Sequence, residues 1–183
     1  MKKQTFLDFG SGIRPYPDAT HLMDYYNFPK ETKLPYIKWD FDKFPYPFPD
    51  NSFDVVYSRC TLEHMNYPIK VMNELYRIAK KKVIVIVPHF SHQAAFNHIE
   101  HKNFFGAGSW VTFYDIDDNE GGIKWKGTPK VSFIYAYGRR LFKWMNWFYE
   151  PLINLNPIRT ERYFLPLVYG GIEFVKFEFD KEQ

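Results

Sequence analysis

The sequence predicts an α/β fold in which a doubly wound, mostly parallel sheet precedes an aromatic-rich C-terminal half. Short apolar segments recur before residue 60, and several of them end in a glycine or an acid. Residues 83–87 form an unbroken β-branched run directly after an amphipathic segment. A strand without polar alternation is buried on both faces, and strands that alternate with a crossover helix form a parallel sheet.

The expected elements follow from spacing and turn residues. Strands are expected at residues 5–9, 21–24, 36–39, 53–57 and 83–87. Residues 68–80 are expected to form a helix, because Pro68 suits a first helical turn and apolar residues recur behind it at helical spacing. Further along, we expect a helix over residues 132–149 and a strand over residues 171–179 with a bulge at Val175.

Composition excludes several classes of protein. The chain has 183 residues, which fits a single domain over residues 1–183. A net charge of +3 is too small to indicate a nucleic-acid surface by itself. The single cysteine, Cys60, excludes an intrachain disulfide and a cysteine-rich zinc site, and it favours a reducing, cytoplasmic setting. No apolar run approaches the ~20 residues of a transmembrane span.

Polar and glycine residues follow the first two expected strands. Gly10-Ser11-Gly12 ends the first strand, and glycines there allow a tight turn and close approach of a ligand. Asp24 ends the second strand, where a carboxylate can accept hydrogen bonds from ribose hydroxyls. Each feature alone also fits an ordinary strand end. Only the order of several motifs can therefore distinguish a ligand-binding site from such a strand end.

Three motifs occur in a specific order: Leu-Asp-Phe-Gly-Ser-Gly at residues 7–12, Phe-Pro-Asp-Asn-Ser-Phe-Asp at 48–54 and Leu-Glu-His at 62–64. Over residues 5–90 the chain resembles the class I S-adenosylmethionine-dependent methyltransferases, in a compact form similar to methyltransferase type 11. The resemblance implies a Rossmann-like fold, methyltransferase activity and S-adenosylmethionine as the cofactor. It also implies that residues 1–90 bind the cofactor, and that residues 91–183 supply the substrate cap and the closing strands.

The resemblance implies a set of cofactor-binding residues, namely Asp8, Gly10, Ser11, Gly12, Asp24, Asp40, Phe41, Asp42 and Ser58. The glycine turn and Asp8 would meet the methionine part, and Asp24 the ribose hydroxyls. Either Asp40 or Asp42 would meet the adenine amino group, and Ser58 would lie near the sulfonium.

The chain departs from this family after the glycine turn. Only eleven residues separate Gly12 from Asp24, and Pro15 and Pro17 lie among them. The helix that usually follows the turn cannot fit in full. We therefore expect trimmed N-terminal helices, with aromatic residues of the second half folded over the edge of the cofactor site to form the acceptor pocket.

Four histidines follow the expected strand 83–87. They are His89, His92, His98 and His101, with Glu100 among them. They could position the chain, act in acid–base chemistry or substrate contact, or bind a metal through the two His-x-x-His pairs. We take His89, at the floor of the acceptor pocket, and His101 nearby as catalytic candidates, and we assign no metal ligand.

The acceptor is expected to be a small molecule or a saccharide hydroxyl. Protein or RNA methylation remains an alternative, as does a non-catalytic cofactor-binding partner subunit. A DNA amino-methyltransferase is disfavoured, since residues 58–61 lack the Asn/Asp-Pro-Pro-aromatic motif that such enzymes carry after the fourth strand. The aromatic segment 141–149 could pack on the sheet, form a homodimer face or make peripheral contact with a membrane that carries a lipid-linked substrate.

Overall fold

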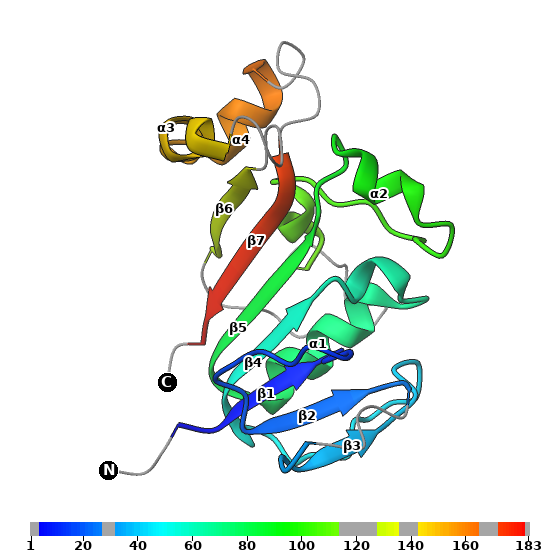
Figure 1. The fold of residues 1–183 in the computed structure, drawn as a ribbon. Helices are drawn as coiled ribbons and strands as arrows, with labels where there is room; N and C mark the ends of the chain where they lie inside the picture. The colour runs from blue at the N-terminus through cyan, green and yellow to red at the C-terminus, as the bar shows by residue number, and fades with distance from the viewer. Residues whose placement is uncertain (1–3, 27–31, 114–127, 136–142, 165–171, 182–183) are drawn as a thin grey trace.

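The computed structural model describes residues 4–26, 32–113, 128–135, 143–164 and 172–181. Its strands form one seven-stranded sheet of order β3-β2-β1-β4-β5-β7-β6 (Figure 1). The strands are β1 (Phe6–Phe9), β2 (His21–Asp24), β3 (Tyr36–Lys38), β4 (Phe53–Arg59), β5 (Ala79–Pro88), β6 (Lys130–Tyr135) and β7 (Ile172–Asp180). The helices and shorter helical turns are η1 (Leu62–His64), α1 (Pro68–Ile78), α2 (Gln93–Asn97), η2 (Ser109–Phe113), α3 (Lys143–Ile153), α4 (Pro157–Arg159) and η4 (Thr160–Phe164).

The strand order changes direction beside β1. From β1 the chain moves outward to β2 and β3, then returns to place β4 and β5 on the other side of β1. These five strands are parallel, whereas β7 runs antiparallel between β5 and β6. The carboxyl ends of β1, β2 and β4 therefore meet at one edge of the sheet (Figure 1). Open α/β sheets bind ligands at such a reversal point.

One face of the sheet is covered by α1, as the helical spacing predicted. Val71, Met72 and Leu75 of this helix are buried in the larger core cluster, together with β-branched residues of β4 and β5. Helix α1 begins at Pro68 and ends at Ile78, and Ala79 already belongs to β5. Five side chains of this amphipathic helix thus anchor the crossover between two parallel strands.

The opposite face is covered near β1 by a loop. Residues 13–20, all of them described, contain no helix, which confirms the expected trimming after the glycine turn. Tyr16 of this loop stacks on Phe6 with ring centroids 5.0 Å apart and lies 4.5 Å from the ring of Tyr57. Aromatic stacking thus takes the place of a helix on this face.

The C-terminal half differs from the sequence prediction in two places. The expected helix over 132–149 is wrong at its start, because residues 132–135 lie in β6 and pair with β7. Leu141 lies outside the described residues, and α3 begins at Lys143. The strand expected near 171–179 is confirmed as β7, but its irregular register lies opposite Ile134 and Tyr135 rather than at Val175, which pairs regularly with Val87.

Helix α3 contacts β6, where the Asn154 side chain exchanges hydrogen bonds with the backbone N–H and carbonyl of Phe133. Its aromatic side chains Trp144, Trp147 and Phe148 are exposed. No helix in the described part of the chain combines the length and apolar character needed to cross a membrane.

Candidate cofactor-binding and active site

The glycine turn after β1 depends on its two glycines for different reasons. Both have positive φ angles, +75° at Gly10 and +53° at Gly12, which side-chain-bearing residues adopt at a cost. A Cβ on Gly10 would lie 2.7 Å from Thr61 Cγ2 and still closer to the Thr61 hydroxyl. A Cβ on Gly12 would meet nothing within 4 Å. Gly10 therefore permits packing against the loop after β4, whereas Gly12 faces open space.

Asp24 joins the glycine turn to the end of β2. One carboxylate oxygen accepts a hydrogen bond from the backbone N–H of Gly12 at 2.8 Å, and the other accepts one from Tyr26 N–H at 3.0 Å. The side chain is buried. Because each carboxylate oxygen can accept a second hydrogen bond, Asp24 can still accept bonds from ligand hydroxyls.

Asp8 is a buried acid on β1, below the glycine turn. Its Oδ2 accepts a hydrogen bond from the Tyr16 backbone N–H at 2.7 Å. Burial raises the pKa of the Asp8 carboxyl to about 6, the Tyr16 hydrogen bond lowers it, and the nearby charge of Asp24 raises it further. A positively charged ligand group beside Asp8 would favour the ionised carboxylate.

Two buried serine hydroxyls lie at the ends of neighbouring strands. Ser58 of β4 is paired in register with Phe9, the last residue of β1, and Ser11 follows two residues after Phe9. Neither hydroxyl has a hydrogen-bond partner among the described residues. Since a buried hydroxyl without a partner is unfavourable, a polar ligand that reaches the strand reversal would satisfy both groups. These residues, with the open space at Gly12, fit a nucleoside-containing cofactor.

The turn after β3 holds Asp40, Phe41 and Asp42. Asp40 accepts a hydrogen bond from the backbone N–H of Asp42 at 3.1 Å, so it stabilises the turn itself. Phe41 is buried against Phe9, with ring centroids 4.2 Å apart. Asp42 accepts a hydrogen bond from the Asn66 side chain through Oδ2, and its buried Oδ1 has no partner within the described residues.

His89 lies at the end of β5 and is fully buried. Its Nδ1 accepts a hydrogen bond from the Ser91 backbone N–H at 3.2 Å and lies 2.8 Å from Ser91 Oγ. Its Nε2 lies 3.1 Å from a carboxylate oxygen of Glu161, which can only accept. The neutral ring therefore carries its proton on Nε2. Sequence reasoning missed Glu161, because nothing local marks a partner 72 residues away.

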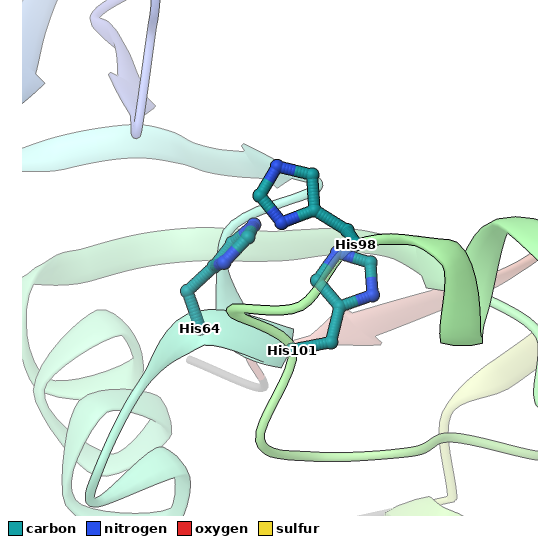
Figure 2. A group of neighbouring side chains, drawn as sticks. All are labelled: His64, His98 and His101. Carbon is teal, nitrogen blue, oxygen red and sulfur yellow. The ribbon is translucent and has the colours of Figure 1, made fainter.

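The other histidines separate from His89. His92 caps α2, where its Nδ1 accepts a hydrogen bond from Ala94 N–H at 3.2 Å. His98 and His101 instead gather with His64 of the Leu-Glu-His motif (Figure 2). Burial, and then the neighbouring histidines, lower the pKa of His64. Glu100 is exposed. The structure thus divides the predicted histidine cluster among three places.

Glu63 is a buried acid that the sequence analysis did not single out. Neither of its carboxylate oxygens has a hydrogen-bond partner in the parts of the chain that the structure describes. Burial raises the pKa of its carboxyl to about 7. Its Oε1 lies 4.0 Å from Nε2 of His101. Only its place between Leu62 and His64 in a family motif could have drawn attention to it.

Comparison with known proteins supports the class that the motifs indicated. Residues 18–87 match the family model described as a methyltransferase domain. The chain is similar in structure to an S-adenosylmethionine-dependent methyltransferase from Archaeoglobus fulgidus, with a TM-score of 0.65, 13% identity, and coverage of 98% of this chain and 87% of that one. No curated protein sequence matches the chain.

Two further structures share the fold. Phosphoethanolamine N-methyltransferase 2 from Haemonchus contortus, in complex with S-adenosyl-L-methionine, gives a TM-score of 0.58 at 16% identity, covering 100% of this chain and 50% of that one. The second is a putative methyltransferase in complex with the Trm112 methyltransferase activator of Haloferax volcanii. It gives a TM-score of 0.52 at 18% identity, with coverage of 99% of this chain and 83% of that one.

The fold is that of the class I methyltransferases, as the sequence predicted. The family match over residues 18–87 agrees with the predicted enzyme class, a methyltransferase. One of the structures that share the fold was solved in complex with S-adenosyl-L-methionine.

Proposed function

We propose that this protein binds S-adenosylmethionine across the glycine turn and transfers its methyl group to a hydroxyl of a small molecule or saccharide. The observation that carries the cofactor site is a pair of buried hydroxyls, Ser11 and Ser58, that have no hydrogen-bond partner among the described residues and lie at the strand reversal beside the open space at Gly12. Ligands of open α/β sheets bind at this place.

Each part of the cofactor has a proposed partner. Asp24 accepts hydrogen bonds from the ribose hydroxyls while it holds the Gly12 turn. Asp8 balances the charge of the methionine amino group. Asp42, rather than Asp40, meets the adenine amino group, because Asp42 Oδ1 is a buried acceptor without a partner within the described residues. Phe41 supports this turn through its packing on Phe9.

When bound, S-adenosylmethionine supplies a methyl group on a positively charged sulfur. Transfer of this methyl group to an acceptor oxygen would leave S-adenosylhomocysteine, and the acceptor hydroxyl would lose a proton. The chain must position the acceptor, exclude water and receive this proton.

We assign the proton to His89 through Ser91. The half-buried Ser91 hydroxyl lies 2.8 Å from Nδ1 of His89, the ring nitrogen that holds the lone pair. Glu161 accepts from the opposite nitrogen at 3.1 Å and would stabilise the imidazolium that forms. Ser91 thus gives the buried histidine a route to an acceptor, in the manner of a general base that acts through one bridging hydroxyl.

Residues 91–183 form the proposed acceptor side. The segment after β5 folds back toward the end of this strand, because Phe105 forms a parallel bridge with His89. Helix α3 exposes Trp144 and Trp147, the latter at 85%, and Arg159 of α4 is exposed as well. Tryptophan with arginine suits the surface of an anionic membrane. We therefore propose a lipid-linked saccharide acceptor, reached from the cytoplasmic side.

Calorimetry with S-adenosylmethionine tests the cofactor site. Asp24→Ala should weaken binding by about 1.5–3 kcal/mol, because charge-assisted hydrogen bonds are lost. Asp18→Ala removes an exposed acid from the same loop and should leave the affinity unchanged. Equal affinity in wild type and Asp24→Ala would remove Asp24 from the site.

Release of S-adenosylhomocysteine, measured with panels of saccharides, small hydroxyl compounds, proteins and RNA, tests the acceptor class. Saccharides should be offered both free and lipid-linked in anionic vesicles. Turnover with protein or RNA alone would contradict the proposed acceptor. Cofactor binding without turnover on any panel would favour a non-catalytic partner subunit, while turnover restricted to free saccharides would contradict the membrane contact.

A further inference from the structure

We propose that His64, His98 and His101 bind a divalent cation of intermediate softness, such as Zn²⁺, where η1 meets the loop after α2. This site uses none of the proposed cofactor residues and neither member of the His89–Glu161 pair. Methyl transfer from a sulfonium does not require it, so the proposal stands independently of the proposed function.

The three imidazole rings converge (Figure 2). Their centroids lie 4.7, 5.0 and 5.1 Å apart, and one nitrogen from each ring lies within 4.8 Å of the other two. A tetrahedral zinc site with Zn–N bonds of about 2.1 Å needs nitrogen separations of about 3.4 Å. The ring of His98 is exposed, so it can rotate toward the other two rings; a small shift between His64 and His101 would complete the geometry.

A hydrogen bond prepares one ring for coordination. Nδ1 of His101 lies 2.8 Å from the carbonyl oxygen of Ala95. Because a carbonyl can only accept, Nδ1 carries the proton, and the neutral ring keeps its lone pair on Nε2. Metal-binding histidines are typically oriented by a hydrogen bond of this kind from their second nitrogen.

The backbone already holds the two segments together. The N–H groups of Lys102 and Asn103 donate to the carbonyl oxygen of Glu63, at 2.7 and 3.1 Å. These bonds fix the residues beside His101 to those beside His64. The ligand frame is thus assembled before any cation arrives, which reduces the entropic cost of binding.

The Glu63 carboxylate is an independent observation in favour of a cation. It is buried, has no hydrogen-bond partner within the described chain, and places Oε1 4.0 Å from the Nε2 of His101 that holds the lone pair. A buried carboxylate of this kind is costly unless a positive charge or a donor lies near it. A cation held by the three rings would supply that charge, with Glu63 beside it.

Titration of the untagged full chain with Zn²⁺, followed by calorimetry, tests the site. Co²⁺ is the second probe, since tetrahedral coordination by imidazole gives a visible absorption band. We expect one equivalent to bind at micromolar or tighter affinity. His98→Ala should weaken binding at least about tenfold. This residue is exposed, so the variant should fold, and circular dichroism checks that it does.

His21→Gln is the matched control, because His21 lies on β2 with its Nδ1 bonded to the Thr20 hydroxyl. It should bind Zn²⁺ like the wild type. Equal binding by His98→Ala and wild type, or no binding by the wild type, would overturn the proposal and would mean that the rings are only packed together. Calorimetry with S-adenosylmethionine on the same samples separates this outcome from a failure of the cofactor site.

Discussion

The two halves of the ligand-binding edge are built in different ways. At the ends of β1 and β2, Asp8 and Asp24 accept hydrogen bonds from nearby backbone N–H groups, within a segment of about twenty residues. At the ends of β4 and β5, His64 meets His98 and His101, and His89 meets Glu161. The first half is held by its own loop, whereas the second is assembled from distant segments. Local motifs therefore describe the first half well and the second poorly.

The two glycines provide the largest expected contrast within the first half. Gly10→Ala should cost about 4 kcal/mol of unfolding free energy, because its Cβ would collide with Thr61 and its φ is positive. Gly12→Ala should cost only about 1–2 kcal/mol, since it adds strain without a collision. Urea denaturation of both variants measures the difference. Equal losses would contradict the separate roles given to the two residues.

The part of the ligand-binding edge at the ends of β4 and β5 can be tested at Ser91. Ser91→Ala should lower the rate of methyl transfer about 10²-fold while cofactor affinity and thermal stability stay nearly unchanged. His89→Ala should lower both the rate and the stability, because it removes a fully buried ring and its contact with Glu161, which among the described residues keeps only the hydrogen bond from Ala107 N–H. A full rate in folded Ser91→Ala would remove the proposed proton route. A pure stability loss in His89→Ala would make that histidine structural.

A gradual effect is expected from pH and Asp8. Its pKa is about 6 in the folded state against 3.8 when unfolded, so the folded state binds the extra proton between these values. Stability should therefore fall as pH rises from about 4 to 6, by about 2–3 kcal/mol in total. Asp8→Asn should lack this slope in thermal unfolding measured across that range. A slope that persists in Asp8→Asn would assign it to another group.

The sequence predicted the fold wherever local patterns suffice. The apolar spacing of α1, the β-branched run of β5 and the glycine turn each act within a few residues, and the structure confirms them. Residues 132–135 were misassigned to a helix, because their strand conformation comes from pairing with β7, about forty residues later.

The candidate site shows the same limit. The residues of the glycine turn lie where the motif order indicated, and their role as cofactor ligands is a prediction. His64 and Glu161 were not anticipated, since only tertiary contacts join them to the histidines after β5. Proximity between segments far apart in the chain leaves no periodic signal in either segment.

The carboxylate of Asp24 bridges the glycine turn and the start of the next loop through its bonds to Gly12 and Tyr26. Binding of a ligand that uses the same oxygens must therefore be thermodynamically coupled to the order of the loop over residues 13–20, which precedes β2. Any substitution that orders this loop in the free protein would raise ligand affinity, and bound ligand would slow amide hydrogen exchange at Gly12 and Tyr16. Residues 13–20 have no helix of their own, so their order should respond to occupancy of the site.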